Sequence, residues 1–425
     1  MRTRSRHALS HTASQPESAT IKNGILPLQR SSPLIPIFLI VVVDVLGLAI
    51  ILPLLPFYAE KLGASPTTVG LLVSTYAVCQ LIAGPLLGRM SDQVGRKRLL
   101  LVSQVGTFIG FIVLAYAQTL WVVFLARIID GITAGNLSLA QAYISDVTKP
   151  EERTKAFGLI GIAFGIGFLI GPALAGLLSV YGYQYPIFAA AALSATSVFT
   201  TWRLLPSVNT ASPDAAKDRR LSLLDWGNYV RYFRQPGLAP LLWQFAAFIF
   251  GFSAFMSGFA LFAERRFTWD GQPFGPKQVG LVYAYFGFLA IILQGGLLGR
   301  LSKRFGDRML VKAGFVTAIA GFAGLGFSYT VPQLLLASTF CSFGTGALRP
   351  ALTSLITQHA GRSEQGSVLG LTQSLMSIAQ IVAPFVAGLM IDHSMLTTWA
   401  MIGVVTSVIG LAIKSGTADL SLHKV

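Results

Sequence analysis

Long apolar segments separated by short polar turns follow one another along almost the whole chain. A transmembrane helix needs about 20 apolar residues to cross the hydrocarbon core of a bilayer. Twelve segments meet this requirement: 34–58, 67–88, 98–117, 120–146, 155–181, 184–204, 238–263, 277–299, 309–328, 331–357, 365–391 and 396–415. The pattern therefore predicts an all-α membrane protein with twelve transmembrane helices.

The second half of this pattern repeats the first. A basic turn at Gly88–Arg98 follows the second span, and a turn of the same form at Gly299–Arg308 follows the eighth. Both turns begin with Gly-Arg-x-Ser, and they are 211 residues apart. Pro172 in the fifth span likewise has a counterpart in Pro384 of the eleventh, 212 residues later. A repeat of this length among membrane spans predicts two pseudo-symmetric six-helix bundles.

Polar stretches set the expected domain boundaries. The expected order is a basic tail (1–33), a first bundle (34–204), a linker (205–237), a second bundle (238–415) and a short tail (416–425). The N-terminal tail lacks the apolar core and the small-residue cleavage site of a signal peptide. We therefore expect this tail to be a cytoplasmic extension.

Charge is scarce and unevenly placed. Charged residues make up 12% of the chain and hydrophobic residues 53%, whereas a soluble domain carries about 25% charged residues. Of the 32 Lys and Arg residues, 26 fall in tails and loops that the twelve spans place on one side. Because basic loops stay in the cytoplasm, both termini are expected there, in a cell (inner) membrane. The same rule accounts for the net charge of +15, so nucleic acid is not an expected partner.

Four charged residues lie well inside the spans: Asp44, Arg127, Asp130 and Arg349. A charge in mid-membrane costs about 2.5–3.5 kcal/mol even on a lenient insertion scale, so each one needs an explanation. Arg127 and Asp130 are three residues apart and share a helix face. We interpret Asp44 and Asp130 as candidates for binding and releasing protons, with Arg127 as their partner. The alternative is a permanent buried ion pair that only fixes packing.

Uncharged polar residues and small residues within the spans are further candidates. Gln80 and Asn136 are expected either to line a cavity or to form hydrogen bonds between helices. The spacing of Gly131 and Gly135 in the fourth span permits close approach of a neighbouring helix. Packing is the expected role of these two glycines.

The fifth span is unusually rich in glycine. It contains Gly158, Gly167, Gly171 and Gly176, with Pro172 directly after Gly171. So many glycines lower the stability of a helix, which favours a helix that kinks at the proline and slides closely past a neighbour. Close packing without motion is the alternative.

Signatures of enzymes and of metal sites are missing from the sequence. There is no Walker-type phosphate-binding motif, no nucleophile elbow and no His-Glu-x-x-His. The two cysteines stand in apolar spans, and the five histidines stand in tails or at the ends of loops. We therefore expect neither an enzyme nor a metal site.

These motifs jointly resemble those of the major facilitator superfamily, over about residues 34–415. The first basic turn is similar to the loop motif of that superfamily in Gly88, Asp92, Gly95, Arg96 and Lys97. Arg127 and Gly131 are similar to its fourth-helix motif, and the glycines and proline of the fifth span are similar to its antiporter motif. The resemblance implies the major facilitator fold, and the antiporter motif implies export rather than uptake.

The resemblance also implies a role for the loop motif. In such transporters the motif aspartate is thought to latch the outward-facing state against the start of the eleventh helix. The motif arginine pairs with an acid at the inner end of the fourth helix. By resemblance, Asp92, Arg96 and Asp146 form this conformational latch. The second copy has Lys303 where Asp92 stands, so it is not expected to latch in the same way.

The chain also resembles the tetracycline/proton exporters. The similar residues are Asp44, Gln80, the Ala-Tyr-Ile-Ser run before Asp146, and Phe-Ala-Glu264-Arg-Arg-Phe-x-Trp269. Gly110 and Ala318 stand where those exporters carry acids, and Asp130 is an addition. The resemblance therefore implies the proton-coupling frame of these exporters rather than tetracycline itself as the substrate.

We expect a proton-coupled antiporter that exports small amphipathic organic compounds, with the proton gradient as its energy source and no cofactor. The nearest alternative is an uptake symporter or facilitator for a small metabolite. A membrane sensor or a membrane-embedded enzyme is less favoured, because neither a large extramembrane domain nor a catalytic signature is visible. The expected partners are the substrate, protons and the lipid bilayer, and the protein is expected to be a monomer.

Overall fold

Each predicted span corresponds to helical structure in the computed structural model, which describes residues 34–148, 153–206, 230–360 and 364–413. The helices of the first half are α1 (Leu34–Lys61), α2 (Pro66–Val94), α3 (Arg96–Ala115), α4 (Leu120–Ile132), α5 (Asn136–Val147), α6 (Arg153–Leu178) and α7 (Gln184–Leu204). A short 3₁₀ turn, η2 (Ser179–Tyr181), follows α6. The predicted N-terminal tail and most of the predicted linker and C-terminal tail lie outside the described residues.

The second half has the same order of helices. They are α9 (Leu238–Arg266), α10 (Pro276–Ile292), α11 (Leu298–Phe305), α12 (Asp307–Gly326), α13 (Val331–His359), α14 (Gln365–Asp392) and α15 (Leu396–Ala412). A π-helical segment, η3 (Leu293–Leu297), joins α10 to α11. Two short antiparallel strands, β1 (Thr268–Trp269) and β2 (Gln272–Pro273), form a hairpin between α9 and α10.

Helices long and apolar enough to cross a membrane dominate the described residues. Eleven helical stretches meet both requirements there, and α15, with 17 residues, is a shorter apolar helix. The prediction of an all-helical, multi-spanning membrane protein is therefore confirmed, with a last span shorter than the others. We call the ends of the helices beside the turns 88–98 and 299–308 the basic end, and the opposite ends the far end.

The two basic turns of the repeat have matching backbone geometry. Gly95 separates α2 from α3 with φ at 101°, and Gly306 separates α11 from α12 with φ at 78°. Both values lie in the left-handed region, where a side chain is disfavoured and glycine is the usual residue. The two glycines are 211 residues apart, so the sequence repeat preserves a required turn conformation.

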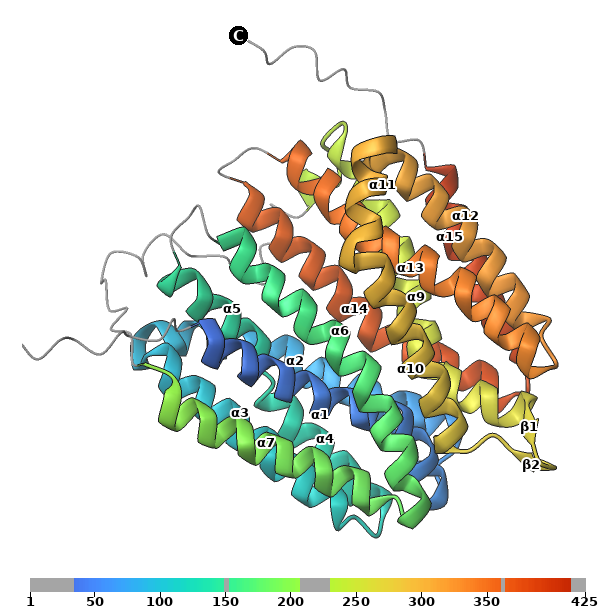
Figure 1. The fold of residues 1–425 in the computed structure, drawn as a ribbon, viewed down its shortest axis with the longest axis horizontal. Coiled ribbons are helices and arrows are strands. Elements are labelled where there is room, and N and C mark those ends of the chain that lie inside the picture. The colour runs from blue at the N-terminus through green and yellow to red at the C-terminus, as the bar shows by residue number, and fades with distance from the viewer. Residues whose placement is uncertain (1–33, 149–152, 207–229, 361–363, 414–425) are drawn as a thin grey trace, which may run out of the picture. The chain divides into compact units, whose positions relative to one another are not determined.

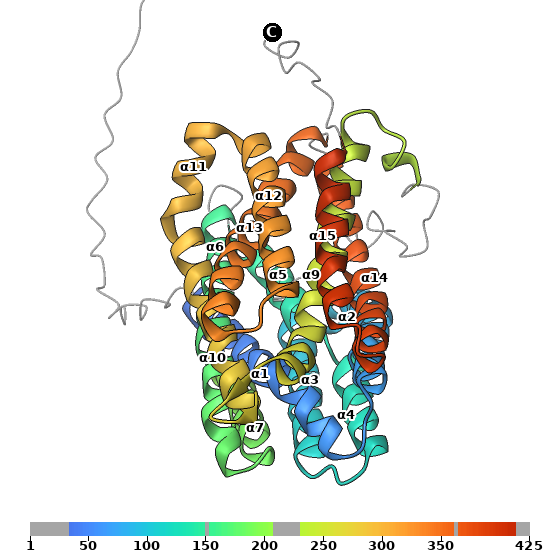
Figure 2. The same cartoon turned by 90° about the vertical axis from the view of Figure 1, so that its right-hand side faces the viewer.

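Two pairs of helices join the halves. Packing of α2 against α14 and of α6 against α10 places segments distant in the sequence side by side (Figures 1 and 2). From the far end to the middle of the helices these pairs leave no room for side chains. A β-carbon at Gly287 would lie 2.6 Å from the carbonyl oxygen of Phe168, and one at Gly176 would lie 3.0 Å from Lys277. Backbones can approach this closely only where small residues face each other.

The contacts between the halves are lost toward the basic end. A β-carbon at Gly84, Gly88, Gly161 or Gly370 would meet no atom within 4 Å. Figure 1 shows the helices of the first half (blue to green) and those of the second (yellow to red) spreading apart in this direction. The described helices are therefore closed together at the far end and open at the basic end.

The fourth span is not a single helix. It divides into α4 and α5 at residues 133–135, and Ser103 of α3 fills the break. The Ser103 hydroxyl donates to the carbonyl oxygen of Thr133 and accepts from the backbone N–H of Gly135, at 3.0 Å in the latter case. These bonds add a side-chain partner at the break, where the backbone N–H of Gly135 also donates to the carbonyl oxygen of Thr133.

Candidate functional site

The two mid-membrane acids predicted from the sequence lie close enough to interact. Asp44 of α1 has Asp130 of α4 as an electrostatic neighbour, and it also faces Ser197 of α7 and Gln104 of α3. The Gln104 amide nitrogen donates to the Ser197 hydroxyl at 2.8 Å. Asp44 is half-buried. Four helices of the first half thus supply polar groups to one place, about 15 Å from the basic end of α1.

Arg127 pairs with the second acid, Asp130. Its Nη2 lies 3.3 Å from an Asp130 carboxylate oxygen, and the two residues are only 4% and 5% exposed. The guanidinium carbon also lies 5.7 Å from the ring centre of Tyr76. Two nitrogens of Arg127, Nε and Nη2, have no hydrogen-bond partner within the described part of the chain. Packing and charge therefore hold Arg127, while part of its donor capacity is unused.

The cluster of Asp44, Asp130 and Arg127 combines two acids with one permanent cation. Arginine stays charged in proteins, so the cluster is neutral when one of the two carboxyl groups carries a proton. Binding and release of that proton would change the charge of the cluster by one. This is the chemistry that a proton-coupling site requires.

The other predicted polar residues are placed differently. The Gln80 amide donates to the Tyr76 hydroxyl at 3.2 Å, so Gln80 joins the cluster through an aromatic ring that sequence analysis missed. Asn136 begins α5, just past the break in the fourth span, and its Oδ1 has no partner among the described residues. A β-carbon at Gly131 would lie 2.6 Å from that of Cys79, which fits the predicted packing role of this glycine.

The glycines predicted as an antiporter motif bring α6 onto α1 beside Asp44. A β-carbon at Gly167 would lie 2.5 Å from Val45, and one at Gly171 would lie 2.6 Å from the β-carbon of Ala49. Gly176 instead faces α10 of the second half. One helix therefore contacts both the Asp44 turn and the opposite half. The surroundings of Gly158 lie outside the described residues.

At the basic end the structure brings together the three predicted latch residues. Arg96 is 5% exposed and lies 2.5 Å from an Asp92 oxygen and 2.9 Å from an Asp146 oxygen. Its guanidinium also donates to Ser91. Lys97 donates to the backbone oxygen of Trp202 at 2.9 Å. The arginine therefore ties α2 and α3 to the end of α5.

The second half carries a matching network of opposite charge. Asp307 stands 211 residues after Arg96 and accepts hydrogen bonds from Ser302, the counterpart of Ser91, and from Ser354 at 2.6 Å. Gln358 also donates to it at 3.4 Å. An aspartate surrounded by neutral donors thus replaces an arginine surrounded by acids. The second turn therefore differs in charge from the first, and that it does not latch in the same way stays a prediction.

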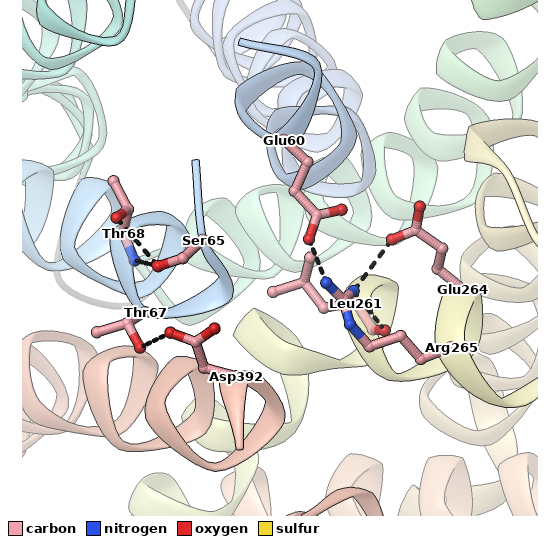
Figure 3. Close-up of polar contacts among 8 residues, drawn as sticks. All are labelled: Glu60, Ser65, Thr67, Thr68, Leu261, Glu264, Arg265 and Asp392. Carbon is pink, nitrogen blue, oxygen red and sulfur yellow. Dashed lines mark hydrogen bonds and ion pairs between the residues drawn. The ribbon is translucent and has the colours of Figure 1, made fainter. Parts of the chain in front are cut away.

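The far end is closed by polar contacts that the sequence did not reveal (Figure 3). Arg265 of α9 lies 2.5 Å from Glu60 of α1 and 3.1 Å from its neighbour Glu264. Thr67 of α2 donates to Asp392 of α14 at 2.6 Å. Both contacts join the first half of the chain to the second. Between them they tie the two halves together at the far ends of four helices.

Comparison with known proteins places this architecture in a family. The family model of the Major Facilitator Superfamily matches residues 37–297 and 271–415. The tetracycline resistance protein, class E, of Escherichia coli is 31% identical over 354 residues, which cover 82% of this chain and 85% of the relative. Multidrug resistance protein 2 of Bacillus subtilis (strain 168) is 27% identical over 355 residues, covering 82% of this chain and 86% of the relative.

Solved structures agree on the fold. The human organic anion transporter MFSD10 (TETRAN) has a TM-score of 0.65 at 23% identity, covering 90% of this chain and 100% of the other. The nucleoside transporter NupG (D323A mutant) has a TM-score of 0.73 at 16% identity, covering 90% and 99% of the two chains. The motifs, the twelve-helix pattern and the family match lead to one conclusion. This chain belongs to the major facilitator superfamily.

Proposed function

We propose that this chain is a proton-driven exporter of small amphipathic organic compounds that works by alternating access. The observation that carries the proposal is the packing of the glycine-rich helix α6 directly on the turn of α1 that holds Asp44. A change of charge at Asp44 acts on a helix that also contacts the opposite half. Tetracycline and multidrug resistance proteins among the relatives support export, and uptake is not favoured.

The arrangement corresponds to an inward-facing state when the basic end is assigned to the cytoplasm. The distribution of Lys and Arg supports this assignment, with both termini in the cytoplasm and the protein in the inner membrane. A compound enters from the cytoplasm between the halves, and α1, α4, α9 and α13 line its path. Closing the basic ends and separating the far ends then releases the compound outside.

Protons drive this change through the acid cluster. From outside, a proton binds Asp44 or Asp130, and the compound leaves from the same state. After the return to the inward-facing state, the proton is released to the cytoplasm and Arg127 compensates the remaining negative charge. Every group named in this cycle belongs to a single chain.

The latch formed by Asp92, Arg96 and Asp146 acts in the outward-facing state. While the basic ends are apart, Asp92 is paired with Arg96 of its own half. When these ends approach each other, the Asp92 carboxylate meets the start of α14, and Asp146 keeps Arg96 neutralised. The latch therefore holds the outward-facing state long enough for compound release.

Transport by the purified protein in proteoliposomes tests export against uptake. Tetracycline and a set of lipophilic amines are supplied on the side of the basic loops, with a pH gradient acid on the opposite side. Export predicts that at least one compound accumulates on the acid side beyond its level in protein-free liposomes, where amines are trapped by protonation alone, and that a protonophore abolishes this excess. Accumulation in the reverse direction would replace export by uptake.

A further inference from the structure

Arg349 of α13 is a charged residue for which the proposed proton cycle has no use. It lies ten residues before the basic end of α13, about 15 Å into the span. Its Nη2 contacts the sulfur of Met376 on α14 at 3.7 Å. Among the described residues no carboxylate pairs with it, whereas Arg127 and Arg96 each pair with acids.

Arg349 lies on the side of α13 that is turned toward the boundary between the halves. Its side chain is exposed, and it contacts α14, the helix that packs against α2 of the first half. Thr345 and Thr353 lie one turn before and after it on the same helix face. On α14, Gln373 lies one turn before Met376, so the residues named one turn away from the Arg349–Met376 contact are uncharged.

The donors of Arg349 are largely unused. A guanidinium offers five N–H groups in a planar fork that matches two oxygens of an acid, and a thioether sulfur is only a weak acceptor. Water can solvate the group while the basic ends are apart. When these ends close, water is displaced and the cation requires an anion in its place.

We propose that Arg349 binds the acidic group of the transported compound, so that the site takes amphipathic organic anions. This inference rests on the proposed transport function and specifies its substrate class. The two halves then have separate tasks. The first half supplies the acids that bind protons, and Arg349 in the second half binds the negative end of the compound, with Met376 beside it as a polarisable apolar contact.

The alternative partner for Arg349 is a residue of the protein itself. Asp44 lies at a similar depth in the first half, so closure could pair the two residues with each other. In that case removal of Arg349 would affect charged and uncharged compounds alike. The experiment below separates these two possibilities.

The test is equilibrium binding to the purified full-length protein without a proton gradient, using 2-naphthoate and its uncharged analogue 2-naphthamide. These probes share their rings and differ in the charge of one group. We expect the wild-type protein to bind the carboxylate about tenfold or more tightly than the amide. Arg349→Gln should abolish this preference, and Arg349→Lys should retain part of it because it keeps the charge without the fork.

Three results would overturn the inference. They are equal binding of both probes by the wild type, an unchanged preference in Arg349→Gln, and an equal loss of both probes in that variant. If Arg349→Gln does not fold, the inference is still tested by the preference of the wild type for the carboxylate probe and by the Arg349→Lys variant. Proton coupling is measured separately, so a protein that shows the preference but moves no protons would contradict the proposed function alone.

Discussion

Arg265 of α9 reaches across the boundary between the halves and lies 2.5 Å from a carboxylate oxygen of Glu60 on α1. The two residues are 205 positions apart and belong to different bundles. Opening of the far end must break this ion pair. It therefore stabilises the arrangement in which the far end is closed, which is the inward-facing state in the proposed orientation.

Arg265→Gln should shift the protein toward the outward-facing state. The pair is partly exposed, with side chains 31% and 18% accessible, so its contribution is about 0.5–1 kcal/mol. This corresponds to a shift of about two- to fivefold in the ratio of the two states. Labelling of a cysteine introduced beside the far end measures the shift.

Arg266→Gln is the matched control for this prediction. Arg266 neighbours Arg265 in the sequence but bonds to Thr397 and lies over the ring of Tyr329, both within the second half. Its loss should leave the ratio of states unchanged. Equal labelling of the two variants would contradict a gating role for Arg265.

Gly171→Ala should impair both stability and transport. Its new β-carbon would lie 2.6 Å from that of Ala49, and α6 would have to move away from α1. Overpacking of this kind costs about 1–3 kcal/mol, which thermal unfolding in detergent can measure. The transport rate of any identified substrate should fall together with the stability.

Gly161→Ala on the same helix provides the comparison. A β-carbon there would meet no atom within 4 Å, and alanine is the better helix former by about 1 kcal/mol. Its melting temperature should be unchanged or higher. If both alanine variants behave alike, close packing of α6 on α1 does not explain the glycines.

Arg96→Gln should reduce transport strongly. The substitution leaves the partly exposed carboxylates of Asp92 and Asp146 without their shared cation, at a cost of about 0.5–1 kcal/mol. Arg96→Lys should retain only part of the transport rate, because a lysine cannot bind both acids through a planar fork. Initial transport rates per folded protein, with folding judged by gel filtration, provide the measurement.

Lys97→Gln tests whether the loss of transport is specific to Arg96 and its two acidic partners. Lys97 is the next residue along the chain and donates to a backbone oxygen, that of Trp202. Its charge is partly exposed, so we expect a smaller loss than for Arg96→Gln. A larger loss would move the functional centre of the loop from Arg96 to Lys97.

The helices could be predicted from the sequence because long apolar runs leave little choice of structure. The repeat also predicted equivalent turns, and Gly95 and Gly306 have the same left-handed backbone. The Asp307 network could have been found in the same way, since Asp307 stands at the repeat position of Arg96. Comparing the charges at equivalent positions of the two repeats would have revealed it.

Other features depend on partners that no local pattern specifies. The break between α4 and α5 is stabilised by Ser103, a residue 32 positions before Gly135 on another helix. Gln104 and Ser197 flank Asp44 only because α3, α7 and α1 pack together. Single polar residues in apolar spans are common, so their sequence positions alone did not distinguish these from packing contacts.

The central claim is that Asp44 couples proton movement to export of a compound. Proteoliposomes carrying a pH gradient, with tetracycline, lipophilic amines and aromatic carboxylates added in turn, test it most directly. The account predicts that at least one compound dissipates the gradient in the wild type and that Asp44→Asn abolishes this effect. An unchanged, compound-dependent proton flux in Asp44→Asn would contradict the account.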